Sequence, residues 1–191
     1  QEGTEIIGIT RDPINGTPSI VVNAQIGVFQ QCLDATITFG DFARTLTLTG
    51  SNTDANTLAS VIADSDTGEV GLDKTGAGTW VLSASNTYTG PTNIGAGTLV
   101  VTGSTGTGDA TLSAGATLAG TGTVGGNLNA AGIVAPGGDG STGTLTVTGN
   151  YVQDVTGLLQ IELAGLDDHD LLNVASDLTA NGGSVEVSLL G

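Results

Sequence analysis

The pair Asp64 and Asp66 is one of two places where this sequence could carry chemistry. The two aspartates alternate with Ser and Thr in the stretch Asp-Ser-Asp-Thr-Gly-Glu, which is similar to the alternating oxygen ligands of a calcium loop. A third Asp or Asn and the more distant glutamate of such loops are missing here. An exposed acidic turn is therefore the simpler interpretation, and a weak calcium site is the alternative.

The second place is Asp167-Asp168-His169-Asp170, which contains the single histidine of the chain. A zinc site usually takes several His or Cys ligands, so one histidine does not make one. A turn before a strand at residues 171–174 is the plainer interpretation. Two carboxyl groups about 5–9.5 Å apart can serve a glycosidase, and either pair of neighbouring aspartates could reach that separation. We nevertheless predict no catalytic residue, no cofactor and no strong metal site.

The charge of the chain excludes some partners. The chain has nineteen acidic residues and only three basic ones, and its net charge is −16. Nucleic acids and anionic membrane surfaces are recognised through basic patches, so neither is expected as a partner. No apolar run approaches the length of a membrane span, so membrane insertion is not expected either. The acidic residues are typical of a charged, solvated surface on a β-rich protein.

Strands are the elements that must position these residues. Four short runs recur between Val70 and Gly103, at 70–72, 79–82, 92–94 and 98–101, and residues alternate within each run. Alternation with period two predicts strands with one buried face. Gly, Asn, Ser, Thr and Pro separate the runs, as turns require. The stretch is interpreted as one coil of a β-solenoid and the start of the next.

Further along, the spacing of apolar residues becomes shorter. From Leu112 to Ile133 they follow one another after six, six, four and five residues, which indicates a corner after each short strand. Three sides make a coil of about twenty residues, the length of known solenoid repeats. Residues 35–191 would then form about seven or eight coils, a rod roughly 35 Å long if coils stack about 4.8 Å apart. The predicted fold is all-β, a single-stranded parallel β-helix; at 56–64 a short helix is the alternative to a strand.

The two ends of the chain differ from this pattern. Residues 1–34 contain β-branched runs outside the repeat and are interpreted as an N-terminal cap or a docking arm. Residues 184–191 form an alternating strand that nothing after it covers. Free strand edges template further pairing, so we predict end-to-end self-association into a filament. The predicted interface consists of Ile6, Ile7, Ile9, Ile20, Val21, Val22, Val185, Val187 and Leu189.

The single cysteine and the first residue bear on the compartment. Cys32 excludes an intrachain disulfide, and its apolar neighbours favour a small buried side chain. The chain starts at Gln1, which fits a mature exported protein or a fragment. The Gly- and Thr-rich composition and low cysteine content favour an extracellular bacterial location.

One stretch resembles a known family. The pattern L-x-K-x-G-x-G-x-W-x-L, then N-T-Y-x-G and G-T-L, runs from Leu72 to Leu99 and includes Lys74, Trp80 and Tyr88. It resembles the autotransporter-associated β-strand repeat of bacterial secreted and surface proteins, with Ala84 where that family often has Gly. The resemblance implies a right-handed β-helix that serves as a stalk or adhesive surface, and it implies no catalytic residue.

The resemblance also suggests roles for three side chains. Lys74 falls on a repeat position, which favours a surface contact over a catalytic base. Trp80 and Tyr88 also fall on repeat positions, where packing inside the coil is the expected role and an exposed ring that stacks on sugars is the alternative.

Three functions follow from this sequence. The first is a non-enzymatic extracellular structural protein, a subunit of a filament, stalk or surface layer. The second is an adhesin that binds glycan or a host surface. The third, least favoured, is a polysaccharide-active β-helix enzyme.

Overall fold

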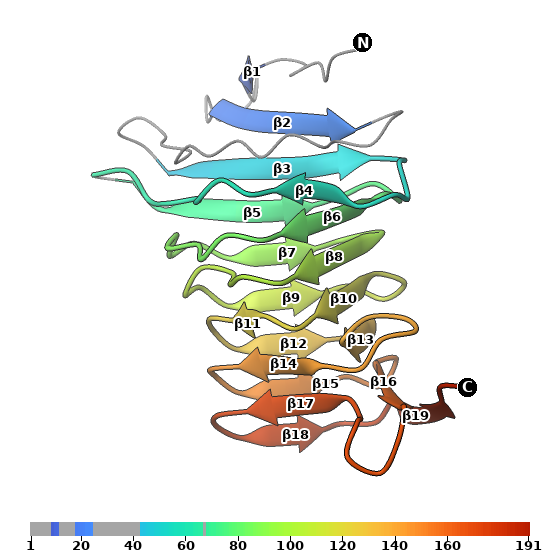
Figure 1. Ribbon diagram of the computed structural model, residues 1–191. Coiled ribbons are helices and arrows are strands. Elements are labelled where there is room, and N and C mark those ends of the chain that lie inside the picture. Colours follow the sequence, from blue (N-terminus) through green and yellow to red (C-terminus); the bar gives the residue numbers. More distant parts are fainter. Residues whose placement is uncertain (1–8, 12–17, 25–42, 67) are drawn as a thin grey trace.

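The computed structural model describes residues 9–11, 18–24, 43–66 and 68–191, and every regular element in these ranges is a strand. The strands wind into a parallel β-helix whose coils stack along one axis (Figure 1). The all-β solenoid predicted from the sequence is therefore confirmed. The segment that starts at Asn56 is a strand, not the alternative helix.

Three parallel sheets form the sides of the solenoid. The first sheet contains, in order, β1 (Ile9–Arg11), β2 (Pro18–Ala24), β3 (Arg44–Gly50), β5 (Val70–Lys74), β7 (Thr92–Ile94), β9 (Ala110–Leu112), β12 (Leu128–Ala130), β15 (Tyr151–Gln153) and β18 (Leu178–Ala180). The second contains β4 (Asn56–Leu58), β6 (Thr79–Leu82), β8 (Thr98–Val101), β10 (Thr117–Gly120), β13 (Ile133–Pro136), β16 (Leu158–Leu163) and β19 (Ser184–Leu189). The third contains β11 (Thr123–Val124), β14 (Thr144–Val147) and β17 (Leu171–Val174). Among the strands of the described residues, only β1 pairs antiparallel, with β2.

The coils differ in length. Thr117 pairs with Ile133, 16 residues further on, whereas Tyr151 pairs with Leu178, 27 residues further on. The seven strands of the second sheet, from β4 to β19, enclose six complete turns. The coils near both ends are longer than the twenty residues assumed from the sequence, so fewer turns form than the seven or eight predicted.

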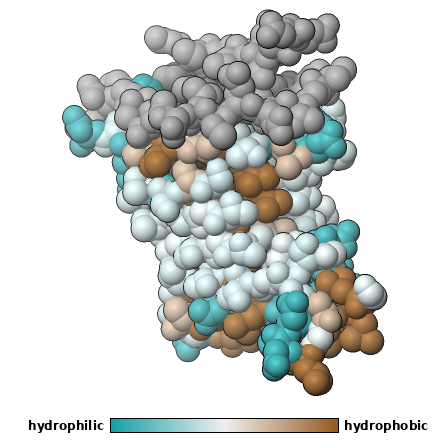
Figure 2. All heavy atoms as spheres, in the orientation of Figure 1, coloured by the Kyte–Doolittle hydropathy of each residue, from teal (hydrophilic) through white to brown (hydrophobic). Residues whose placement is uncertain are grey.

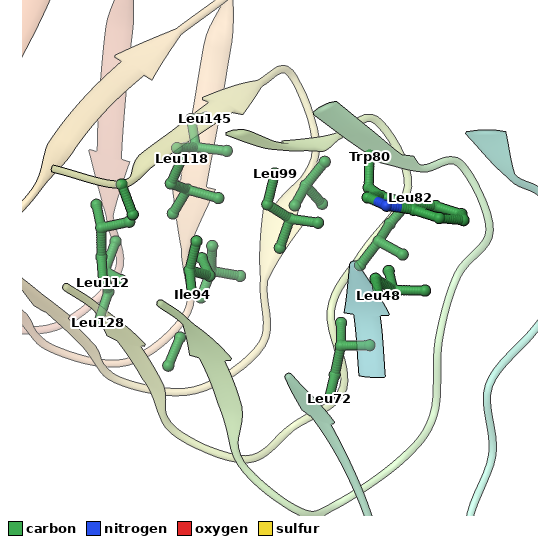
Figure 3. Packing of buried hydrophobic residues seen from close by; sticks show 14 of the residues in the cluster. Leu48, Leu72, Trp80, Leu82, Ile94, Leu99, Leu112, Leu118, Leu128 and Leu145 are labelled. Carbon is green, nitrogen blue, oxygen red and sulfur yellow. The ribbon is translucent and has the colours of Figure 1, made fainter. Parts of the chain in front are cut away.

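A continuous apolar core runs along the inside of the solenoid. Inward side chains of one coil lie beside those of the next, as in the row Trp80, Leu99, Leu118 and Val134, all completely buried. Figure 3 shows such leucines following one another from coil to coil. Each coil buries its apolar face only against its neighbours, because three short strands cannot enclose a core alone. The alternation seen in the sequence therefore reports the inward face correctly.

The N-terminal strand β2 continues the solenoid of its own chain. Residues Ser19–Ala24 pair in parallel with 45–50 of β3, and β1 pairs with the other edge of β2 at Pro18–Ile20. The strand that contains Ile20, Val21 and Val22 lies on the first coil of its own chain. Docking of these residues on a neighbouring molecule, and the choice between a cap and a docking arm, stay predictions. Ile6, Ile7 and Cys32 lie outside the described residues.

The opposite end presents its apolar residues to solvent. β19 pairs with β16 along six positions, and its outer edge has no further strand among the described residues. Val185 and Val187 are each 60% exposed and Leu189 is 80% exposed, whereas inward residues of the inner coils are completely buried. Apolar side chains also gather at this end in the space-filling view (Figure 2). These three residues are thus accessible, and their role in an assembly interface stays a prediction.

Coil corners depend on glycine where backbones approach closely. At Gly97, φ is +65°, and a Cβ atom would lie 2.5 Å from the carbonyl oxygens of Gly76 and Gly78 in the preceding coil. We expect Gly97→Ala to lower the free energy of unfolding by more than 2 kcal/mol, because left-handed strain of about 1 kcal/mol adds to a backbone clash.

Two matched variants separate these effects in denaturant unfolding. Gly115→Ala has a similar φ of +80° but open space around the Cβ, so it reports strain alone. Gly165 has neither a left-handed φ nor an atom within 4 Å of its Cβ position, so Gly165→Ala serves as the neutral control. Equal losses for the Gly97 and Gly115 variants would show that close approach of the coils is unimportant.

Candidate functional site

Lys74 is the most unusual polar group of the described residues. It is completely buried, in the inward row between Leu48 and Ile94. Its Nζ donates hydrogen bonds to the carbonyl oxygens of Thr75 at 3.1 Å, Gly76 at 2.9 Å and Ala96 at 2.8 Å. The predicted surface contact is therefore wrong. The signal was present in the sequence, because alternation from Leu72 places residue 74 on the inward face.

Trp80 and Tyr88 are also completely buried. The indole Nε1 of Trp80 donates to the carbonyl oxygen of Thr49 at 3.0 Å, and the Tyr88 hydroxyl lies 2.7 Å from the Thr92 hydroxyl. Burial raises the pKa of the Tyr88 phenol, although hydrogen bonds from Thr92 and Gly106 act in the opposite direction. Neither ring is available to stack on a sugar, so the packing role expected for both is the one the structure has.

Asp64 ties two coils together. Its carboxylate accepts hydrogen bonds from the backbone of Val70 at 2.8 Å, the backbone of Thr89 at 3.0 Å and the Thr89 hydroxyl at 2.7 Å. Partial burial acts to raise its pKa, but these hydrogen bonds outweigh burial and lower it. Asp66 is exposed and forms no such contact with the residues that the structure describes. The two side chains therefore differ in their contacts.

The other acidic group surrounds the loop between β13 and β14. Asp170 is 4% exposed and accepts from the backbone amides of Gly143 at 2.8 Å and Glu162 at 2.9 Å. Burial raises its pKa most; these two bonds act against the rise, and the charges of Glu162 and Asp168 add to it. Asp168 bonds the hydroxyl of Thr142.

The same loop is held by a further carboxylate. Glu162 accepts from the amides of Gly140 at 3.0 Å and Ser141 at 2.9 Å. These carboxylates therefore hold one loop against another; the sequence placed Asp170 in a polar cluster without this role, and it did not single out Glu162. The sequence gives only a weak signal for this role, because an acidic residue beside a Gly-rich loop is common on any protein surface.

Asp167 and His169 complete the predicted cluster. Both are exposed, and the backbone of His169 forms an antiparallel bridge with Leu163. Within residues 43–66 and 68–191, no three His, Cys, Asp or Glu side chains are placed to hold a metal ion. Weak calcium binding at Asp64, Asp66, Asp167 and Asp168 stays a prediction. No helix of the described residues is long and apolar enough to cross a membrane.

Parts of this chain are similar to known proteins. Residues 72–101 match the passenger-associated-transport-repeat family. A stretch of 69 residues is 51% identical to the adhesin BmaC autotransporter of Brucella suis biovar 1 (strain 1330), covering 36% of this chain and 2% of the adhesin. A stretch of 122 residues is 40% identical to an extracellular serine protease of Serratia marcescens, covering 64% of this chain and 11% of the protease.

The fold and the matches agree with each other. The chain is a parallel β-helix, and its residues 72–101 match a passenger-associated-transport repeat, in agreement with the resemblance seen in the sequence. Lys74, Trp80 and Tyr88 all lie within the matched residues, and all three are interior in the structure. The aligned segments span only a small part of the length of the two relatives.

Lys74 gives the fold a defined dependence on pH. Burial lowers its pKa to about 8 from a usual value of 10.5. Between these two values the unfolded chain holds a proton that the folded chain has released, so the free energy of unfolding increases as the pH rises through this window. We expect denaturant unfolding at about pH 7 and about pH 9.5 to show this increase in the original chain. Lys74→Met, which cannot titrate, should lack it; an equal increase in both proteins would contradict the assignment.

Asp64 and Asp66 make a matched pair for mutation. Asp64→Ala removes a carboxylate that accepts three groups across two coils, and we expect a loss of about 1.5–3 kcal/mol of unfolding free energy. Asp66→Ala should change it by less than about 0.5 kcal/mol, as at other free surface positions. Urea unfolding in EDTA and in millimolar Ca²⁺ measures both. A calcium-dependent rise in the free energy of unfolding that both variants abolish would instead assign the loop to calcium.

Proposed function

We propose that this chain is a non-catalytic structural segment of a secreted or surface-exposed bacterial passenger, a stalk built from stacked coils. One observation carries the proposal: three of the polar side chains that could do chemistry hold coils and corners together. Lys74 bonds three backbone carbonyls, and Asp64 and Asp170 accept backbone amides from neighbouring segments. The similarity to passenger regions supports the same function and location.

The finer proposal is that stalks associate end to end through the last coil. The occupant of the exposed coil is another copy of this chain. The inner face of β19 carries Val185, Val187 and Leu189, each more than half exposed, and its free edge offers unpaired backbone groups. A coil is the surface that complements another coil, because it has the same strand spacing and the same inward rows. A contact of this kind grows a filament unless it closes on itself.

Adhesion is the second candidate function. It is favoured by the 51% identical segment of an autotransporter adhesin. Because Trp80 and Tyr88 are buried, recognition of a glycan or host surface would depend on exposed loops and strand faces. Retention of the chain on a glycan array or on host cells would support this function over the stalk.

Catalysis is tested directly, since one relative is an extracellular serine protease. We expect no release of reducing ends or unsaturated products from neutral and acidic glycans, and no cleavage of casein. Turnover of a glycan that disappears in Asp167→Asn or Asp168→Asn would overturn the non-catalytic proposal, as would proteolysis that survives purification to homogeneity.

Self-association is measured by size exclusion with light scattering over a range of concentrations and salt. We expect the mass to rise with concentration, and more at high salt, because a net charge of −16 opposes contact and salt screens it. Val187→Asp should keep the chain monomeric, because it places a charge on the exposed inner face of β19.

Thr111→Asp adds the same charge on the outer face of β9 and should associate as the original chain does. A monomer at every concentration and salt would reject the filament and leave the stalk. Equal association of both variants would move the contact away from β19.

A further inference from the structure

The corner that follows β5 contains a small cage of backbone oxygens. Thr75 and Gly76 belong to this corner, and Ala96 belongs to the corner of the next coil. Their three carbonyl oxygens lie 2.8–3.1 Å from the same nitrogen, Nζ of Lys74. The cage thus spans two coils, and its occupant bridges them.

The chemistry of the cage selects its occupant. A primary ammonium group has three N–H donors and no acceptor, so three carbonyl oxygens satisfy it completely. None of these oxygens comes from a carboxylate, whereas calcium takes six to eight oxygens and usually several carboxylates. A buried ammonium is tolerated only where its donors are bonded, which the cage provides.

The approach to the cage is apolar. The Lys74 side chain leaves the backbone between Leu48 and Ile94, which are buried at 0% and 1% exposure. The four-carbon alkyl chain of Lys74 therefore lies in the core and places the nitrogen at the corner. The site as a whole matches a short alkylammonium ion.

We propose that the carbonyl oxygens of Thr75, Gly76 and Ala96 form a binding site for a primary alkylammonium group. In the folded protein Lys74 occupies it and joins two coils. When the lysine side chain is shortened, the site takes a free alkylammonium ion of matching length.

The test is rescue of Lys74→Ala. Alanine keeps the Cβ, so the missing atoms correspond to n-propylammonium. We expect the melting temperature of this variant to fall well below that of the original chain. Refolding in n-propylammonium chloride should then raise it by roughly 3–6 °C in a saturable manner, because a ligand that binds only the folded state stabilises it.

Three controls separate the cage from general effects. Equal NaCl corrects for ionic strength, and 1-propanol has the same shape without the charge. Lys74→Met fills the apolar path without an ammonium group, so it should be destabilised and should not respond to the amine. The original chain should not respond either.

Two results would overturn the proposal. One is a Lys74→Met variant as stable as the original chain at neutral pH, which would show that the ammonium group is dispensable. The other is an amine response that is equal in the alanine and methionine variants or matched by 1-propanol. If Lys74→Ala does not fold alone, folding that depends on n-propylammonium supports the site, and failure to fold at every amine concentration overturns it.

Discussion

The structure depends on the parallel stacking of one coil on the next. Backbone hydrogen bonds run from coil to coil, and each inward side chain lies on its counterpart, as Leu99 lies between Trp80 and Leu118. A single coil has too little apolar area to hold itself folded, so its stability belongs to the contacts with both neighbours. Small aliphatic residues suffice for such a core, which explains how the chain folds with few aromatic residues.

Buried polar groups set the register of this stack. Asn86 accepts the amide of Ile62 at 2.8 Å from one coil and donates to the carbonyl oxygen of Ser104 at 2.7 Å in another. Lys74 and Asp64 likewise bond segments of two coils. Apolar rows alone would tolerate slippage by a coil position, but an unpaired amide or ammonium in the core would cost several kcal/mol. The polar positions of the repeat, Lys74 and Asn86, therefore have a structural role.

The fold was predictable from the sequence because strands of three or four residues leave a clear period of two. Leu112, Leu118 and Leu128 all lie in the short strands expected of them. Coil length was less predictable, since loops of any length can leave the core unchanged. The role of Lys74 was misjudged because a charged residue suggests a surface, although its position in the alternation pointed inward. The bonds from Glu162 to Gly140 and Ser141, and from Asp170 to Gly143, join residues more than twenty positions apart, and no local pattern encodes them.

The direction of the hydrogen bonds determines how such a rod carries load. In this solenoid the hydrogen bonds lie along the axis, and each set of bonds between two coils is a rung. A pull on the two ends therefore passes its full force through every rung in turn. Rungs loaded in series give way one at a time, so the coils separate one after another. Each released coil frees 16–27 residues, which can extend to about 50–95 Å at 3.3–3.6 Å per residue. Tension along the axis thus lengthens such a rod stepwise, one coil at a time.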